Sequence, residues 1–269
     1  MKKFLFIVVV LVGLFFAFYT KEKNPFSGKS TMAIVSNDSL FKESFAAYGE
    51  FIDESNVIEN SKDALIVQEV GTKLRGAAEK WLKAEGSEDY LAHYEWEYHL
   101  VQADEINAWC MPGGKIVIYT GILPITKNKD GLATVMGHEL AHALLNHGQQ
   151  SQSANILKQL GAIGVAILSS GESYNTQEIA QTAYDAGSHL LGTLPFSRAN
   201  ETEADEIGLA LMTIAGYNPE EACAFWSRMS EQNDNTQFDF LSTHPSDEKR
   251  INALQAAIPK AKEIAEQMK

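Results

Sequence analysis

A five-residue segment near the middle of the chain has the residue types and spacing of a zinc-binding motif. It reads His138-Glu139-Leu140-Ala141-His142, the pattern H-E-x-x-H. Residues four apart on an α-helix project from one face, so both imidazoles can reach a single zinc ion. Glu139 lies one step round the helix, where its carboxylate can take a proton from a water molecule on that ion. The motif predicts metal-assisted hydrolysis. The alternative is a chance match, because so short a pattern is not specific by itself.

The third histidine of this region, His147, is a less suitable ligand. It follows His138 by nine residues, which places it on the opposite face of a helix that turns about 100° per residue. The long metzincin motif is also absent, because Leu145 and Gly148 occupy the positions where that motif has glycine and histidine. We therefore expect His147 to be an end-of-helix residue near the last carbonyl groups.

A better third ligand lies downstream, in the segment NETEADEIG at residues 200–208. Glu201 and Asp205 are four residues apart and share one face of the expected helix. Catalytic zinc sites commonly have three protein ligands and leave the fourth position to water. Glu201 can complete a two-histidine, one-glutamate site, and Asp205 can accept a hydrogen bond from the histidine nitrogen that does not bind zinc. The alternative is a solvated acidic face, which we expect for Glu203 and Glu206.

Helices and a small sheet are expected to carry these residues. Steps of three and four between apolar residues predict helices over 61–84 and 132–148, and the second contains the motif. Strict alternation over 94–100 predicts a strand, and residues 106–120 predict a hairpin whose turn is the Pro-Gly-Gly at 112–114. This order of elements predicts a mostly helical α+β fold with a small β-sheet or hairpin beside the active-site helix.

Further helices are expected in the second half of the chain, over 155–168, 197–215, 219–229 and 247–258. Ser197 and Ser246 are suitable N-caps for two of them. The segment 155–168 is apolar but too short to span a bilayer. We expect it to pack in the core, with a membrane-contacting or gating role as the alternative.

Composition excludes one class of partner. The chain has 269 residues, a formal net charge of −13 and no basic cluster, whereas nucleic-acid binding needs a positive patch. We therefore expect no nucleic-acid partner. Two cysteines, Cys110 and Cys223, are too few for a disulfide scaffold. They could form one bridge, but two separate buried thiols fit their apolar surroundings better.

The N-terminus differs from the rest of the chain. Two lysines precede an unbroken apolar run over 4–19, whose length lies between a signal-peptide core and a comfortable membrane span. We expect an uncleaved membrane anchor, with a cleaved signal as the alternative. Either would place the protein at the periplasmic face of the inner membrane or in the periplasm. The expected organisation is a signal or anchor segment over 1–20, a linker over 21–40 and one domain over 41–269 that contains the zinc-binding motif.

Four segments, in order along the chain, resemble the motifs of one family. They are INAWCMPGGKIVIYTGIL, GHELAHALLNH, SRANETEADEIGLALM and LSTHPSDEKRI. With these motifs the sequence resembles the M48 family of zinc metallopeptidases, in the gluzincin group, and especially its periplasmic or membrane-tethered members. The resemblance covers nearly the whole body, from about Phe51 to Ile258.

The resemblance implies a role for each matching residue of the metal site. It makes His138, His142 and Glu201 the ligands of one zinc ion. Glu139 becomes the catalytic glutamate, and Asp205 becomes the partner of a zinc-binding histidine.

Other matching residues lie around that site. His244 falls where the family has a histidine close to the active site, which would stabilise the oxyanion or occupy the open zinc position in a resting state. Asn107 and Ala108 fall beside the substrate cleft. Arg250 is expected to be a structural ion-pair partner.

The resemblance also implies an activity, the hydrolysis of peptide bonds in unfolded or misassembled proteins as part of cell-envelope quality control. The family's prenyl proteases carry several membrane spans around the site, whereas only residues 4–19 could span a membrane here. We therefore do not expect prenylated substrates. An extended substrate could add as a strand beside the 106–120 hairpin. The alternatives are a zinc-containing, chaperone-like binding protein with little proteolytic activity, and a membrane-tethered lipid-binding module that uses 155–168.

Overall fold

The structure is a computed structural model, and it describes residues 21–188, 194–232, 240, 244 and 247–269. The apolar run over 4–19 lies outside these residues. The strands are β1 (Lys21–Lys23), β2 (Ser30–Met32), β3 (Val57–Ile58), β4 (Glu97–Val101), β5 (Ala108–Met111) and β6 (Lys115–Tyr119). The α-helices are α2 (Asn37–Glu54), α3 (Lys62–Ala84), α4 (Leu123–Thr126), α5 (Lys129–Leu144), α6 (His147–Ser169), α7 (Tyr174–Ser188), α8 (Leu194–Ile214), α9 (Glu220–Ser230) and α11 (Glu248–Gln267). Two short 3₁₀ helices span Glu88–Leu91 and Thr120–Ile122.

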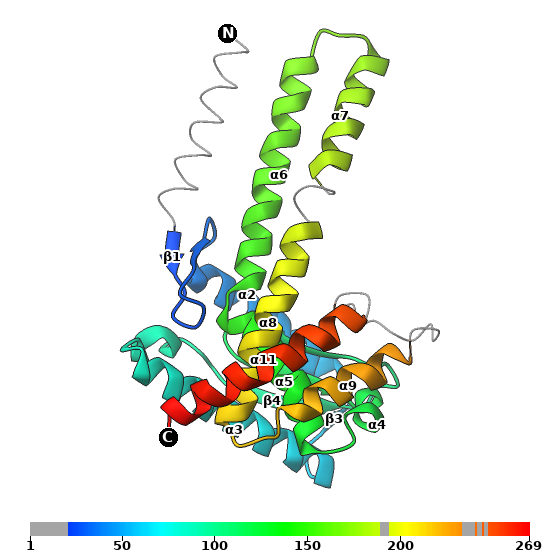
Figure 1. Cartoon of the computed structure of the whole chain (residues 1–269). Coiled ribbons are helices and arrows are strands. Elements are labelled where there is room, and N and C mark those ends of the chain that lie inside the picture. Colours follow the sequence, from blue (N-terminus) through cyan, green and yellow to red (C-terminus); the bar gives the residue numbers. More distant parts are fainter. Residues whose placement is uncertain (1–20, 189–193, 233–239, 241–243, 245–246) are drawn as a thin grey trace.

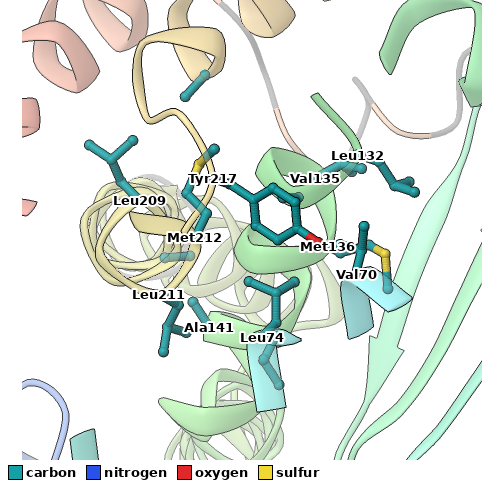
Figure 2. Close-up of a cluster of buried hydrophobic side chains, with 14 of the residues drawn as sticks. Val70, Leu74, Leu132, Val135, Met136, Ala141, Leu209, Leu211, Met212 and Tyr217 are labelled. Atoms are coloured by element: carbon teal, nitrogen blue, oxygen red, sulfur yellow. The ribbon is translucent and has the colours of Figure 1, made fainter. Parts of the chain in front are cut away.

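The predicted α+β class, mostly helical with a small sheet, is confirmed (Figure 1). Helix α5, which contains the H-E-x-x-H motif, lies at the centre of the body and contacts α3, α8, α9 and β5. Every residue of α5 from Gly131 to Ala141 is buried. Figure 2 shows part of this core, where apolar side chains of α3, α5 and α8 meet, among them Val70, Leu74, Val135, Met136, Leu211 and Met212. His138 is therefore held in a closely packed interior, whereas His142, one turn further along α5, is partly exposed.

Helices α5 and α8 approach closely because a glycine of one faces a glycine of the other. A Cβ atom on Gly208 would lie 2.9 Å from the carbonyl carbon and oxygen of Gly137, and 2.9 Å from the amide nitrogen of His138. Backbone atoms cannot move aside as a flexible side chain can, so only glycine fits at this crossing. The close approach brings the α8 residues Glu201 and Asp205 towards the motif.

The main sheet is mixed, with strand order β3-β4-β6-β5. Strands β4 and β6 are parallel, whereas β3–β4 and β5–β6 are antiparallel. The predicted hairpin over 106–120 is confirmed, with Cys110 opposite Ile116. Its turn contains Gly113 and Gly114, whose φ angles of 90° and 92° are accessible to glycine at little cost. Strand β5 is an edge strand of this sheet, next to α5.

Helices α6 and α7 pair with each other and extend away from the body (Figure 1). The Tyr184 hydroxyl of α7 donates a hydrogen bond to the Lys158 carbonyl of α6 at 2.9 Å. Within 155–168 only Gly164 is buried, so the prediction of a core helix is wrong: this stretch packs on a second helix rather than in the body. None of the helices in the described ranges has the length and hydropathy needed to cross a membrane.

Residues 24–36, which we call the N-terminal strap, pack against the body instead of forming a loose linker. The Asn24 side chain donates to the Leu144 carbonyl at 2.7 Å and to the Tyr90 hydroxyl at 2.9 Å. The ring of Phe26 is buried against Trp81, with ring centroids 5.5 Å apart. Helix α2 then begins within the expected linker, at Asn37.

Two helix boundaries differ from the predicted ones near the motif. Helix α5 ends at Leu144 rather than at Gly148. Asn146 adopts a left-handed conformation with φ 57°, which asparagine tolerates, and this residue turns the chain. His147 is therefore the first residue of α6 and not the last part of α5.

Two predicted caps are also corrected. Ser197 lies inside α8, which begins at Leu194. Ser246 lies outside the described residues, and the N-cap of α11 is Asp247, whose side chain accepts a hydrogen bond from the Arg250 amide at 2.8 Å. That helix continues through Pro259 to Gln267, well beyond the expected end.

Candidate metal centre and active site

Four side chains from three separate parts of the chain converge beside α5. They are His138 and His142 of α5, Glu201 of α8, and His244, and one ligand atom from each lies within 4.8 Å of the others. The Nε2 atoms of His138 and His142 are 3.1 Å apart. The Glu201 carboxylate lies 3.4 Å from Nε2 of His138 and 3.3 Å from Nε2 of His142. The three ligands predicted from the sequence therefore meet in space.

The geometry and chemistry of these atoms fit a zinc ion. Zinc binds imidazole and carboxylate ligands tetrahedrally at about 2.0–2.2 Å, which sets neighbouring ligand atoms about 3.3 Å apart. The separations among His138, His142 and Glu201 are 3.1, 3.3 and 3.4 Å. Two imidazole nitrogens and a carboxylate that face one another need a proton or a cation between them. His138, His142 and Glu201 are the residues that would hold zinc here.

His138 is oriented from behind by Asp205, as the sequence predicted for that carboxylate. Nδ1 of His138 lies 3.0 Å from the Asp205 carboxylate, so a proton on Nδ1 leaves the lone pair of Nε2 for the metal. Arg250 in turn donates two hydrogen bonds to Asp205, at 2.8 and 2.7 Å, and lies over the ring of Trp226. Although burial opposes ionisation, Arg250 and His138 hold the pKa of Asp205 below its usual value. Arg250 thus forms the expected ion pair.

The pKa values of the two motif histidines are shifted in opposite directions. Burial lowers the pKa of His142 to about 3, so its imidazole is neutral, which is the form that binds metals. Burial also acts against protonation of His138, but hydrogen bonds to Asp205 and Glu201 outweigh it and raise the pKa to about 9. Burial likewise opposes ionisation of Glu201, but hydrogen bonds from the histidines hold its pKa far below the usual value. A metal ion would replace the proton that these groups share.

Glu139 is a buried carboxylate next to the ligand cluster. Its Oε1 atom makes no hydrogen bond within the described part of the chain and lies 3.4 Å from Nε2 of His244. Burial is the main reason that its pKa is raised. An unsatisfied buried carboxylate costs free energy, and a raised pKa makes it a better proton acceptor. The position suits the general base that the motif predicts.

His147 and Glu203 are placed differently from what the sequence led us to expect. His147 is buried, and its Nδ1 lies 2.9 Å from Nδ1 of the metal-ligand candidate His142. Its Nε2 lies 3.3 Å from Glu203, whose other oxygen pairs with Lys29 at 2.8 Å. His147 is therefore not at the C-terminal end of the motif helix, but is the first residue of α6, and Glu203 is not a solvated surface carboxylate. The prediction of where His147 lies assumed one continuous helix from His138 to His147, whereas the chain turns at Asn146.

Glu206, the other carboxylate expected at the surface, is indeed half exposed. It lies 3.8 Å from Lys260 and away from the cluster. The pKa of Glu203, by contrast, is lowered to about 2. The hydrogen bond from His147 is the largest cause, and the contact with Lys29 is a further one. Two glutamates on one helix therefore have contrasting surroundings.

His244 lies on the open side of the ligand cluster. Its Nδ1 is 2.9 Å from the Glu201 carboxylate and 3.2 Å from Nε2 of His138. Its ring also packs on Phe240, with centroids 4.7 Å apart. His244 can therefore serve as a fourth donor to the same ion.

A cavity of about 910 Å³ lies beside the cluster. His142 and Glu201 line it on the metal side, and its other walls come from the β5–β6 hairpin and from α6, α7 and α8, including Cys110, Pro112, Ala154, Leu157 and Tyr184. The volume is within the range of ligand-binding pockets. An elongated ligand in this cavity would pass next to the metal ligands.

The two predicted substrate-binding residues lie at the start of β5. Ala108 is buried, and its amide donates a hydrogen bond to the Asn107 side chain at 2.8 Å. The side chain of Ala108 is therefore closed off from a substrate. The Tyr119 amide donates to the Asn107 carbonyl at 3.1 Å. Because antiparallel pairing alternates along a strand, this bond directs the amide and carbonyl of Cys110 to the free edge of β5. Cys110 and Cys223 are both free thiols.

Comparison with known proteins identifies the class. The family model described as Peptidase family M48 matches residues 76–258, and the chain belongs to this family of metallopeptidases. It is 37% identical over 174 residues to the mitochondrial metalloendopeptidase OMA1 of Schizosaccharomyces pombe, which covers 64% of this chain and 49% of that protein. It is 28% identical over 267 residues to the metalloendopeptidase OMA1, mitochondrial, of Homo sapiens, covering 95% of this chain and 49% of that protein.

A bacterial protein is also similar. The beta-barrel assembly-enhancing protease of Escherichia coli (strain K12) is 31% identical over 160 residues, covering 57% of this chain and 32% of that protein. The chain thus spans about half the length, or less, of these curated relatives. The predicted membership of the M48 family is confirmed.

The comparison with these relatives also contradicts the predicted periplasmic location. The OMA1 relatives from Schizosaccharomyces pombe, Saccharomyces cerevisiae, Arabidopsis thaliana and Homo sapiens are all named as mitochondrial enzymes. The prediction relied on a signal or anchor pattern over residues 4–19, and such a pattern states that a segment can enter a membrane, not which membrane. Those residues lie outside the described ranges, so the predicted membrane contact stays a prediction.

Proposed function

We propose that this protein is a zinc-dependent metalloendopeptidase that hydrolyses peptide bonds in unfolded or misassembled proteins. The observation that carries the proposal is the convergence of His138, His142 and Glu201 beside the buried carboxylate of Glu139. This arrangement combines a three-ligand cation site with a proton acceptor. The family membership and the metalloendopeptidase relatives support the same activity.

The residues of the site have distinct tasks in this reaction. Zinc, when bound, supplies a Lewis acid that polarises the scissile carbonyl and makes water easier to deprotonate. Glu139 accepts the proton of the attacking water and returns it to the leaving amine. Asp205 holds the proton on Nδ1 of His138 and so keeps Nε2 free as a ligand. The apolar surroundings of α5 exclude water and strengthen these electrostatic interactions.

The substrate in this proposal is an extended polypeptide. The free edge of β5 offers the main-chain groups of Cys110, and the adjoining cavity is lined by Cys110, Pro112, His142 and Glu201. A peptide that pairs with this edge would be recognised through its backbone, with little dependence on its side chains. Unfolded polypeptides present such extended segments along much of their length, which supports a role in protein quality control.

His244 would control access to the ion. Structural zinc sites have four protein ligands, whereas catalytic sites keep one position open for water. With Nδ1 of His244 at 3.2 Å from Nε2 of His138, the fourth position is within its reach. We propose that His244 occupies this position in a resting state and must withdraw before water and substrate enter.

The test compares cleavage with zinc content in the full-length protein. Glu139→Gln should abolish cleavage of unfolded casein while zinc stays near one ion per chain, since Glu139 is not a ligand. Glu206→Gln removes a half-exposed carboxylate of α8 and should leave both measurements unchanged. Undiminished cleavage by Glu139→Gln would contradict the proposal. If zinc-loaded wild type left all unfolded substrates intact but suppressed their aggregation, the chaperone-like alternative would hold instead.

A further inference from the structure

His142 has a partner on the side away from the metal cluster that the proposed reaction does not use. Its Nε2 faces His138 and Glu201, at 3.1 and 3.3 Å, so its Nδ1 points away from the ion. That Nδ1 lies 2.9 Å from Nδ1 of the buried His147. We propose that His147, Glu203 and Lys29 form a chain of hydrogen bonds, ending in an ion pair, that orients the metal-ligand candidate His142, and that the N-terminal strap is thereby a working part of the metal site.

The direction of each hydrogen bond follows from metal binding. A neutral His142 that offers the lone pair of Nε2 to a metal must carry its proton on Nδ1. It then donates this proton to Nδ1 of His147. His147, with a lone pair at Nδ1, carries its own proton on Nε2 and donates it to Glu203 at 3.3 Å. The other oxygen of Glu203 forms an ion pair with the Lys29 ammonium at 2.8 Å. Each imidazole proton meets an acceptor, so the two hydrogen bonds run in one direction, from His142 to Glu203.

The contacts behind His142 resemble those behind His138, the other histidine that would bind the metal. His138 donates to Asp205, which is held by Arg250. Behind His142 come the imidazole of His147, the carboxylate of Glu203 and the ammonium of Lys29. This chain therefore has one more ring than the chain behind His138. In both cases a carboxylate held by a cation sets the tautomer of a ligand, and such partners typically change metal affinity by about 10–100-fold. The second chain uses His147 because α6 starts there and brings the ring behind α5.

The strap holds Lys29 at the end of this chain. The Asn24 amide donates to the Lys29 carbonyl at 2.9 Å, and the Gly28 amide donates to the Asn24 carbonyl at 2.8 Å, which closes a tight turn. The Asn24 side chain also bonds the Leu144 carbonyl at the end of α5. Further along, the Ile34 amide donates to the Ser153 hydroxyl of α6 at 3.1 Å. The strap is therefore tied both to the helix that carries His142 and to the helix that begins with His147.

The first test measures zinc affinity by competition with a chelator, which does not depend on peptidase activity. His147→Leu should weaken zinc binding about 10–100-fold. His147→Gln should recover part of the loss, because its amide can accept from His142 and donate to Glu203. Glu203→Gln should weaken binding less than His147→Leu. Lys29→Met should weaken it least, because an exposed ion pair contributes little. The matched control is Glu206→Gln, on the same helix, which should bind zinc as wild type does.

The second test reads the orientation of the ligand directly. Nitrogen NMR of the zinc-loaded protein should report a proton on Nδ1 of His142 in wild type, and a changed signal of that proton in His147→Leu. A purely structural role of His147 would lower the melting temperature without altering this signal or the order of affinities among the variants. Wild-type zinc affinity in His147→Leu and in Glu203→Gln would overturn the inference. If His147→Leu does not fold, Glu203→Gln and His147→Gln decide by the same criterion.

The inference rests on the metal-binding part of the proposed function and can fail separately from it. A wild-type protein that binds no zinc would contradict both proposals. Equal zinc affinity in wild type, His147→Leu and Glu203→Gln would contradict only this one.

Discussion

The Glu201 carboxylate of α8 lies 3.4 Å from Nε2 of His138 on α5. This distance is set by the crossing of the two helices, where Gly208 meets Gly137 without room for a Cβ atom. The site is thus a property of helix packing, because the third candidate ligand comes from a different helix than the first two.

Enlarging the glycine at the crossing should disturb both stability and metal binding. A Cβ on Gly208 would lie 2.9 Å from backbone atoms of Gly137, and overpacking of this kind typically costs about 1–3 kcal/mol. We expect Gly208→Ala to lower the free energy of unfolding by that amount, measured by urea denaturation, and to weaken zinc binding. Gly76→Ala is the control, since Gly76 is in α3 and a Cβ there meets nothing within 4 Å. It should raise stability by about 0.5–1 kcal/mol. Equal effects of the two substitutions would contradict the packing argument.

Two substitutions of Asp205 should separate metal binding from stability. Asp205→Ala removes the acceptor for His138 and the nearer carboxylate partner of the buried Arg250. We expect zinc affinity to fall about 10–100-fold and the free energy of unfolding to fall by about 3–5 kcal/mol. Asp205→Asn keeps an acceptor for His138 but removes the nearer of two carboxylates beside the guanidinium, leaving Glu201 at 3.4 Å. It should retain most of the zinc affinity while losing stability, and loss of affinity without loss of stability would contradict this division.

The stability contributed by Glu203 should depend on pH in one direction. His147 and Lys29 lower its pKa from 4.5 to about 2 in the folded protein. A carboxyl group with a depressed pKa stabilises the fold above its unfolded pKa, and the effect is lost as pH falls through the folded value. The stability difference between metal-free wild type and Glu203→Gln should be constant above pH 4.5 and shrink towards pH 2. Glu206→Gln controls for the loss of one charge. A difference that grew on acidification would have the wrong sign.

If the substrate pairs with the edge of β5, blocking successive backbone amides of a peptide substrate should weaken its binding at every second residue. Methylation of a single backbone nitrogen removes one donor and blocks one position of the ladder. In a series of peptides methylated at successive residues, cleavage should be sensitive at every second position on one side of the scissile bond. The measurement is KM for each peptide with the zinc-loaded protein. Sensitivity without a period of two would argue against strand addition.

The parts of the fold that could be predicted are those set by local periodicity. The step of four residues between His138 and His142, and again between Glu201 and Asp205, identified both helices and the faces that meet. The alternating residues and the Pro-Gly-Gly turn identified the β5–β6 hairpin. These features depend only on neighbours in sequence.

The features that were missed depend on contacts between distant segments. Nothing in the composition of the strap distinguishes Asn24, which bonds the end of α5, from an asparagine in a flexible linker. The apolar residues of α6 indicated a buried helix, but not that its partner would be α7 outside the main body. His147 was misjudged because a single left-handed residue, Asn146, separates it from the helix of the motif. An asparagine followed by His-Gly was the available signal for that turn.

The most direct measurement for the metal site is zinc titration of wild type beside Glu201→Gln and Glu206→Gln, with competition by a chelator. Wild type and Glu206→Gln should each bind one zinc ion with the same affinity, whereas Glu201→Gln should bind it far more weakly or not at all. One tightly bound zinc in Glu201→Gln, with an affinity equal to that of wild type, would contradict the account.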